Sequence, residues 1–582
     1  AAAASSAPGA LVPSKHRDMI PDRRHHASPA LLVLCLLSVH FACDQATAWV
    51  TNAPTLIQRR PFQQSTTLRT TSLAAGRKRT TMTAVAAPRS NSAITAASEA
   101  GADSRPSSTA IVGGGPTGLA VALMLARRGY RDISVMERLN QPPPPSSPKW
   151  DNAERSYNLG IGGRGQVALA KLGAVDRVLD WCAEAVGRKD WNPQTPDGAE
   201  RIFSERKYKT KVIARDRLAS CLLEEIREKH SDAVTVRFNV ECTGAKWLEP
   251  GGTGSGATLS LRDTSGGETS ELTVDFVVAA DGVKSAIRDA LEGDNALTRA
   301  LSGGDVRVKR FPRANEFAYK VVPFKLDVGW RNDFNYSHRT KGGITLEALP
   351  TKEGGQVGVL LFRPDDERIL GLKDAADGRA LFEELFPQFA GMVEDEAYER
   401  LALQEVSRLP AFSYTGPVLH LGKSAVLLGD AIKSVKPYFG LGVNTAFEDC
   451  IALDRRCLEE TGDDLAAALP LYSRRRAPEA KDLVELSRGF DRTGVAGFFG
   501  FILPLILDSV FHNALPRVFA PNTIAFLQTE GITFRGIRRR KGLDRVMQGM
   551  VLMAAGVAAV SALRVGAGAL GPLVASAFAA IR

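Results

Sequence analysis

The chain has 582 residues, which is enough for two to four domains at the usual size of about 100–200 residues. Its hydrophobic fraction of 44% is ordinary for a globular protein that buries a large core. The net charge of +10 is concentrated in separate basic stretches, so it gives little support to nucleic-acid binding, and no nucleic-acid partner is expected. The seven cysteines have neither a CxxC pair nor a Cys/His spacing typical of metal sites, so we expect reduced packing thiols and no bound metal.

Residues 1–106 are predicted to be a disordered targeting region. Basic residues from Arg23 to His26 precede a short apolar run, and Ala46-Thr47-Ala48 then offers a cleavage site, which is the pattern of a signal peptide. The following segment, to about Ser98, is rich in Ser, Thr, Ala and Arg and free of acids, as in a transit peptide. Together these segments resemble the bipartite plastid address of algae with secondary plastids, so a plastid localisation is expected. The alternatives are a plain disordered extension, or targeting to the mitochondrion or the endoplasmic-reticulum membrane.

Residues 108–138 have the pattern on which the functional prediction depends. A short apolar run meets a turn with Gly113, Gly115 and Gly118, a helical segment follows, and a second strand pattern ends at Glu137. Strand, glycine turn, helix and strand, with an acid about 20 residues on, form the dinucleotide-binding fingerprint. The glycines permit the tight turn, the approach of a pyrophosphate and close helix packing. The helix start attracts phosphates, and the acid can accept hydrogen bonds from a ribose.

Three later stretches place further ligand-binding groups. Two buried-strand patterns end in Asp281-Gly282 and in Gly429-Asp430, and the carboxyl ends of parallel strands are where open α/β sheets bind ligands. Arg215 stands where another strand pattern enters a helix, so it can reach a phosphate; an exposed arginine at a helix start is the alternative. The glycine-rich run 437–444 precedes a helix and brings backbone N–H groups close to a ligand.

Two other regions have weaker patterns. Residues 160–165 make a second formal GxGxxG, but no apolar strand precedes it and no acid follows at the right distance. We interpret it as a false positive for a second nucleotide fold, and a glycine turn against the first cofactor explains it as well. Residues 305–365 alternate apolar and polar in several short runs, which predicts a mostly antiparallel sheet separate from the parallel one.

The C-terminal end is apolar. Residues 494–507 are too short for a simple span and suit a buried or interfacial helix. Residues 546–563 and 565–581 are apolar but of marginal length, and the basic cluster from Arg535 to Arg545 precedes them, where it could meet anionic head groups. A membrane-associating segment or transmembrane helix is expected here, and a helix packed on the protein's own surface is the alternative.

Taken together, four motifs resemble the single-component FAD-dependent aromatic hydroxylases. The motifs are IVGGGPTG at 111–118, RxxLxxxL from Arg215, AADG at 279–282 and LLGD at 427–430. Within that family the chain is most similar to the kynurenine 3-monooxygenase-like members. The matching pieces include 155–159, 164–165, 346–350, 360–364, 429–444 and 447–450. The resemblance covers about residues 110–545.

This resemblance implies an FAD-dependent monooxygenase that uses NADPH or NADH and O2 to hydroxylate an aromatic substrate through a flavin hydroperoxide. No second nucleotide fold is expected, so NAD(P)H would bind transiently against FAD. The implied cofactor-binding residues are Gly113, Gly115, Gly118, Glu137, Arg138, Arg215, Asp281, Gly282, Gly429, Asp430, Gly442, Val443 and Asn444. The loop expected to face the reactive edge of the flavin is Pro437, Tyr438, Phe439 and Gly440.

The substrate side departs from the family. By the resemblance, Arg188 would pair with a substrate carboxylate, and a bidentate clamp suits that role; a surface arginine is the alternative. The tyrosine that assists this arginine in the family falls at Lys209, with Tyr208 beside it, and the family histidine after the last motif is Lys433. Glu347 stands in the pocket sheet where the family is apolar. Arg188, Tyr208 and Glu347 are the candidate substrate-binding residues, and an altered substrate is plausible.

Two alternatives remain at this stage. One is an epoxidase or hydroxylase of a plastid isoprenoid or carotenoid within the same flavoprotein superfamily, and the other is a non-catalytic membrane-bound flavoprotein. The predicted fold class is α/β, with a discontinuous Rossmann-like FAD domain, an inserted antiparallel-sheet substrate domain and a C-terminal helical membrane-associating region. The expected order is FAD domain (107–185), mixed segments (186–270), FAD domain (271–304), substrate domain (305–418), FAD domain (419–465), helical region (466–545) and hydrophobic tail (546–582).

Overall fold

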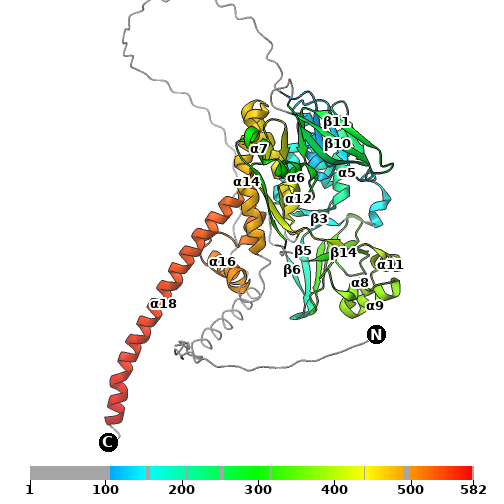
Figure 1. Cartoon of the computed structure of the whole chain (residues 1–582). Helices are drawn as coiled ribbons and strands as arrows, with labels where there is room; N and C mark the ends of the chain where they lie inside the picture. The colour runs from blue at the N-terminus through cyan, green and yellow to red at the C-terminus, as the bar shows by residue number, and fades with distance from the viewer. Residues whose placement is uncertain are drawn as a thin grey trace, which may run out of the picture. The chain divides into compact units, whose positions relative to one another are not determined.

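The computed structural model describes residues 105–152, 157–203, 207–248, 255–312, 317–437, 440–489 and 497–579 (Figure 1). Side chains are described to Ser561, without those of 151, 152 and 559. The predicted targeting region, apart from Arg105 and Pro106, therefore lies outside the described residues.

A six-stranded sheet forms the base of the cofactor half. Its order is β20 (His420–Leu421), β21 (Ala425–Leu427), β12 (Phe276–Ala279), β1 (Thr109–Val112), β2 (Ile133–Glu137) and β8 (Val234–Phe238). All neighbours are parallel except β20 and β21. The four residues of β1 are all buried, as expected for a central parallel strand that is covered on both faces. The parallel sheet predicted from the apolar runs is therefore present.

Helices and a smaller sheet cover this base. The helix α2 (Pro116–Arg127) packs against α5 (Arg215–Lys229) and α12 (Leu441–Leu453), and α12 also packs against α3 (Gly163–Leu172). The three-stranded sheet β9 (Val240–Trp247), β10 (Ala257–Asp263) and β11 (Thr269–Val274) lies beside α6 (Ala286–Gly293). Because β1, β2, β12 and β21 run parallel, the segments that follow them meet at one edge of the sheet. That edge is where the predicted glycine turn and the two strand-end acids come together.

A seven-stranded sheet forms the other half. Its order is β18 (Ser407–Arg408), β14 (Ala318–Phe324), β17 (Gln356–Phe362), β16 (Thr345–Pro350), β15 (Phe334–Arg339), β5 (Gly187–Asn192) and β6 (Thr195–Ile202). All pairs are antiparallel except β15 with β5. The expected antiparallel sheet is present, but it also includes β5 and β6, which come from far upstream. One face of this sheet carries an aromatic core with Trp191, Tyr336 and Phe389. The helices next to this core are α9 (Ala375–Leu385), α10 (Pro387–Ala390) and α11 (Asp395–Leu403).

Two further small sheets join the halves. The strands β13 (Val306–Phe311), β19 (Phe412–Pro417) and β22 (Lys433–Ser434) form one, so the two ends of segment 305–418 pair with each other outside the large sheet. The strands β3 (Asn158–Ile161), β7 (Thr210–Ala214) and β4 (Ala183–Ala185) form the other. Both sheets directly precede predicted cofactor-binding segments in the chain: β22 leads into the 437–444 run, and β7 leads into α5, which begins with Arg215.

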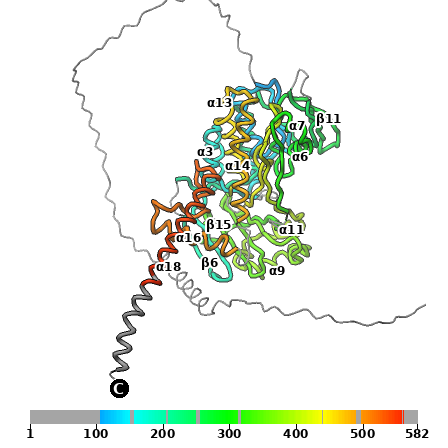
Figure 2. The backbone as a smooth tube through the Cα atoms, turned by 60° about the vertical axis from the view of Figure 1, so that its left-hand side comes forward, coloured from blue at the N-terminus to red at the C-terminus, as the bar shows by residue number. Residues whose placement is uncertain are grey.

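The C-terminal part is helical, with α14 (Leu465–Arg488), α16 (Leu503–Ala514), α17 (Thr523–Gln528) and α18 (Phe534–Ala579). The helix α18 is one continuous element that packs against α14, α16 and α17, and Figure 2 shows α16 beside it. Within the described part of the chain, no helix combines the length and the apolar character that a bilayer crossing requires. The apolar segment predicted at 494–507 begins partly outside the described residues, and its described end belongs to a short π-helix, Phe498–Ile502, and to α16.

The basic cluster before the hydrophobic tail is used inside the protein. Lys541 and Arg545 on α18 lie 3.3 Å and 2.8 Å from the buried carboxylate of Asp508 on α16. Arg538 bonds to Asp482 at 2.6 Å and Arg540 lies 3.1 Å from Asp544. Each of these four side chains therefore already pairs with a carboxylate of the protein, and contact of the cluster with anionic head groups stays a prediction.

Candidate active site

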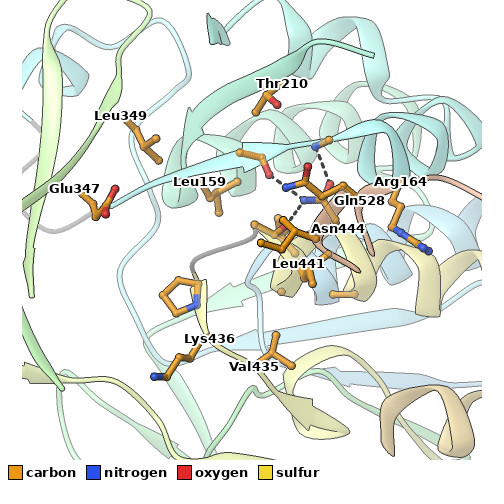
Figure 3. Close-up of a pocket in the computed structure, with 18 of the residues that line it drawn as sticks. Leu159, Arg164, Thr210, Glu347, Leu349, Val435, Lys436, Leu441, Asn444 and Gln528 are labelled. Atoms are coloured by element: carbon orange, nitrogen blue, oxygen red, sulfur yellow. Dashed lines mark hydrogen bonds between the residues drawn. The ribbon is translucent and has the colours of Figure 1, made fainter. Parts of the chain in front are cut away.

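One continuous cavity of about 2310 Å³ lies between the cofactor edge of the parallel sheet and the inner face of the seven-stranded sheet. Its volume exceeds the roughly 300–1,000 Å³ typical of a pocket for one small ligand, so it has room for a dinucleotide and a second molecule. Figure 3 shows its centre, with Asn444 and Leu441 on one side and Glu347 and Leu349 on another.

Two glycines in the turn after β1 leave no room for a side chain. A Cβ on Gly118 would lie 1.8 Å from the carbonyl oxygen of Gly113, and one on Gly113 would lie 2.4 Å from that of Ala280. Gly113 also has a φ of +101°, which side chains rarely tolerate. Gly115 is the N-cap of α2 and lines the cavity with Thr117, and no side chain caps this helix start, so its free N–H groups suit a phosphate.

The acid and the arginine of the fingerprint lie on either side of this turn. Glu137, at the end of β2, accepts a hydrogen bond from the N–H of Gly114 at 2.8 Å, so it stands at the turn as predicted. Arg215 begins α5 and lines the cavity, and its Nη2 would lie 3.4 Å from a Cβ on Gly115. Arg138 follows with an exposed side chain, and neither Glu137 nor Arg138 is among the described residues that line the cavity. The roles of both toward the cofactor stay predictions.

The two strand-end acids differ in exposure: Asp281 is half-buried, whereas Asp430 is exposed toward the cavity. Oδ2 of Asp281 accepts from the N–H of Ala286 at 2.8 Å, whereas its Oδ1 is buried with no partner among the described residues. Burial raises the pKa of Asp281, against hydrogen bonds that lower it. Asp430 faces the cavity, and burial raises its pKa while Lys433 and Arg215 oppose the rise. Both carboxylates can therefore gain from a ligand that donates hydrogen bonds.

Each of these acids has a glycine beside it, Gly282 or Gly429, at which the backbone can come close to a neighbouring group. Both adopt positive φ, +79° and +61°, and Gly282 lines the cavity. A Cβ on Gly429 would lie 2.8 Å from Cγ2 of Thr117 in α2, so this turn packs directly on the fingerprint helix.

Asn444 joins two glycine turns. Its Nδ2 donates to the carbonyl of Gly160 at 2.9 Å and to that of Gly440, and its Oδ1 accepts from the N–H of Gly162 at 3.0 Å (Figure 3). The second GxGxxG is thus a turn against the first cofactor site, and the described structure gives it no dinucleotide fold of its own. Gly442 and Val443, at the start of α12, line the same cavity.

The loop expected to face the flavin is described only at its two ends. Pro437 and Gly440 both line the cavity, while Tyr438 and Phe439 lie outside the described residues. The residue before the loop, Lys436, was missed by the sequence analysis: it is 6% exposed and also lines the cavity. Burial lowers its pKa to about 8. No sequence pattern around Lys436 could have predicted that this lysine is buried beside the cavity.

A charged group occupies the sheet side of the cavity. Arg188 on β5 donates from Nε to Asp190 at 2.7 Å, and its Nη2 lies 3.8 Å from Glu347 on β16. Ser337 on β15 donates to Glu347 at 2.8 Å. Burial raises the pKa of Glu347, with Arg188 and Ser337 opposing the rise and Asp190 adding to it. The strand register explains the grouping, because Ser337 pairs with both Asp190 and Glu347 across three strands.

The cradle fits a flavin dinucleotide. Gly113 and Gly118 leave no room for side chains in the turn after β1, a helix start is uncapped, and a buried oxygen of Asp281 has no partner among the described residues. Comparison with known proteins agrees. Residues 107–301 match the FAD binding domain family. The chain is 28% identical to the kynurenine 3-monooxygenase of Salinispora arenicola over 78% of this chain and 96% of that protein. It is 24% identical to that of Anopheles gambiae, over 80% and 90%.

The chain is an FAD-dependent aromatic monooxygenase, similar to kynurenine 3-monooxygenase. A solved structure of 2-methyl-3-hydroxypyridine-5-carboxylic acid oxygenase shares the fold, with a TM-score of 0.51 and 19% identity over 71% of this chain and 98% of that one. The monooxygenase takes FAD as cofactor and NADPH or NADH as co-substrate. When bound, FAD supplies the redox chemistry with O2, and the protein positions the aromatic ring and excludes water.

In the monooxygenase, Tyr208 and its neighbour Lys209 differ in whether they reach the cavity. Tyr208 lines the cavity and lies against Gly163, where a Cβ would be 2.9 Å from its Cδ2. Its neighbour Lys209 instead pairs with Glu184 at 2.6 Å, with 64% of its side chain exposed. Tyr208, and not the residue at the family tyrosine position, is therefore the one available to a ligand.

The C-terminal helices of the monooxygenase also line the cavity, which the sequence analysis did not predict. Ile524, Ala525 and Gln528 of α17 contribute, and Arg164 fastens this segment to the cofactor turn. The buried guanidinium of Arg164 donates to the carbonyl of Leu527 at 2.9 Å and to Glu448 on α12 at 2.7 Å. This link holds the C-terminal region against the cofactor site.

Proposed function

We propose that the aromatic substrate is an amino acid whose zwitterionic head group lies at Arg188 and Glu347, with L-kynurenine the first compound to test. The observation that carries this proposal is that the guanidinium of Arg188 and the carboxylate of Glu347 lie 3.8 Å apart on the cavity wall. Asp190 already bonds to Nε and Nη2 of Arg188, so Nη1 is the donor offered to a substrate carboxylate, and an ammonium group suits Glu347. The relatives named kynurenine 3-monooxygenase support the choice of compound.

The wall next to this charged group is apolar. Leu349, Val359 and Leu361 line the cavity from β16 and β17, and Tyr319 joins them from β14. A molecule with a charged head and an aromatic ring matches the two parts of this surface. An isoprenoid or carotenoid substrate fits less well, because it would cover the Glu347 carboxylate with hydrocarbon and give it no hydrogen bond.

Glu347→Gln tests the head-group assignment. We expect the Kd of L-kynurenine to rise about tenfold, the usual scale of one lost charge-assisted contact, while its desamino analogue binds equally to both forms. In the wild-type enzyme, binding should weaken as the pH falls, because protonation removes the negative charge of Glu347. The raised pKa places this loss above the ordinary glutamate value of about 4.3, and Glu347→Gln should abolish it. The measurement is the flavin absorbance change on titration.

The matched control is Glu383→Gln, an exposed acid on α9. Equal affinities for L-kynurenine in wild type and Glu347→Gln would contradict the head-group assignment. If no amino acid with an aromatic ring perturbs the flavin or stimulates NADPH oxidation, the substrate class itself is wrong.

We also propose that α18 associates with a membrane, in keeping with the predicted plastid address. Support comes from exposed apolar side chains on this helix: Val546, Met550, Val551, Leu552, Met553, Val557 and Val560. Since the preceding cations are largely paired within the protein, we expect binding to liposomes that is insensitive to salt. Flotation of the full chain, compared with a variant ending after Gln548, measures this; equal recovery of both in the lipid fraction would contradict it.

A further inference from the structure

A second group of cavity-lining residues lies apart from the cofactor cradle and from the seven-stranded sheet. It is formed by β13, β19 and the end of β22, with the C-terminal end of α14 beside them. We call it the basic lobe and define it by Lys309, Phe311, Tyr414, Lys436 and Arg488. Nothing in the function derived above uses these residues.

The outer part of the basic lobe is an aromatic surface with two cations. The guanidinium carbon of Arg488 lies 3.6 Å from the ring centre of Phe311, and Nζ of Lys309 lies 5.8 Å from the same centre. The ring of Tyr414 follows at 6.2 Å. Guanidinium and ammonium groups bind phosphate oxygens, and aromatic rings provide stacking surfaces for planar heterocycles. Two flexible cations held at one ring can close on a single phosphate group.

The inner part of the basic lobe reaches the flavin loop. The strand β22 ends at Ser434, and Lys436 directly precedes Pro437. Nζ of Lys436 lies 5.5 Å from the ring centre of Phe317 and 5.9 Å from that of Phe412, so these rings flank its charged end. A path of cations and aromatic rings therefore leads from Arg488 and Lys309 to the loop expected to face the flavin.

The basic lobe has an excess of positive charge. Among the described residues of α14 that line it, the one carboxylate is Glu485, which pairs with Arg538 and lies 4.0 Å from Lys481. The local field thus favours an anionic ligand over the zwitterion considered for the sheet side.

We propose that the basic lobe binds NADPH, with phosphates at Lys309 and Arg488 and the nicotinamide end directed past Lys436 toward the flavin. The described chain has one dinucleotide fold, which the FAD cradle occupies, so the co-substrate needs another anionic-ligand site that adjoins the same cavity. In the reaction the nicotinamide ring gives a hydride, two electrons and one proton, to FAD and leaves as NADP⁺. The proposal does not depend on which aromatic compound is hydroxylated.

Lys309→Gln and Arg488→Gln test the basic lobe in the full-length, FAD-loaded protein. For each we expect the Kd of NADP⁺, measured by calorimetric titration, to rise about tenfold. The NADPH concentration that gives half-maximal anaerobic flavin bleaching should rise equally, with an unchanged limiting rate and an unchanged FAD content. The affinity of the wild type should also fall more steeply with added salt than that of either variant. The matched control is Lys423→Gln, an exposed lysine in the turn between β20 and β21, which should behave as wild type.

Two results would overturn the proposal. One is a Kd of NADP⁺ in both variants within twofold of the Lys423→Gln value. The other is a fall in FAD content that parallels the loss of NADP⁺ binding, because the lobe would then support the cofactor cradle. Since NADP⁺ binding needs no aromatic substrate, a failure of the kynurenine assignment leaves this test unaffected.

Discussion

Gly118→Ala is expected to yield a colourless, FAD-free protein. The added methyl group would lie 1.8 Å from the carbonyl oxygen of Gly113, and relief requires either that α2 moves away from β1 or that the turn opens. Either movement displaces the N–H groups that a pyrophosphate needs, because they belong to the same turn and helix start. We expect FAD affinity to fall at least about 100-fold, or roughly 3 kcal/mol.

Flavin absorbance per mole of purified protein measures this result, and far-UV circular dichroism of the apoprotein reports whether the fold persists. Gly391→Ala is the control, because a Cβ at this glycine meets nothing within 4 Å. A Gly118→Ala protein with the wild-type ratio of flavin to protein would show that the glycine turn does not hold the cofactor. Where the variant does not fold, Glu137→Ala tests the same turn, because it removes the carboxylate that accepts a hydrogen bond from Gly114. We expect a smaller loss of FAD affinity for this variant.

The cofactor half could be read from the sequence because its signals are local. A glycine at positive φ, a strand that is apolar throughout and an acid at the end of a strand each leave a mark within a few residues. Gly113, Asp281 and Asp430 therefore reached the edge of the sheet that was predicted for them. The role of Arg138, which follows β2 at the same edge, rests on the family resemblance alone and stays a prediction.

The substrate half depends on pairings between distant segments, which no local pattern encodes. Arg188 faces Asn335 because β5 joins the sheet parallel to β15, about 150 residues later in the chain. The contact of Glu347 with Arg188 follows only from that pairing. The sheet predicted over residues 305–365 was wrong to include β13, for the same reason. The alternation of β13 is that of any half-buried strand, and only the fold pairs this strand with β19.

Element boundaries moved where a single residue breaks the regular backbone. Residues 234–240 alternate like a single strand, but the backbone divides at Asn239, whose φ of 60° ends β8 before β9 begins. Residues 381–389 have the apolar spacing of one helix, but the helix divides at Phe386, because Pro387 starts a new helix and restricts the residue before it. In both cases the residue type was visible in the sequence, but its conformation depends on the packing around it.

Lys433 shows how a departure from the family changes the structure around it. This lysine, 3% exposed, pairs with Asp449 on α12, which is 1% exposed and also binds Arg476 at 2.8 Å through Nε. Asp449 accepts from the N–H of Gly429 as well, at 3.1 Å, so one carboxylate holds two cations and the turn that carries Asp430. Removing one partner of a buried pair is far costlier than losing a surface pair, because the remaining charge stays buried.

Asp449→Asn should therefore lower the free energy of unfolding by about 3–5 kcal/mol, since it leaves Lys433 and Arg476 uncompensated in the interior. Urea unfolding followed by tryptophan fluorescence measures the change. The control Asp395→Asn breaks the exposed pair with Arg379 and should leave the free energy of unfolding close to that of the wild type. Lys433→Met should cost less than Asp449→Asn, because Arg476 still neutralises the carboxylate, and adding Lys433→Met to Asp449→Asn should recover part of the loss. Equal and additive effects of the two single variants would mean that the buried charges are not coupled, and that the lysine is accommodated by some other part of the cofactor turn.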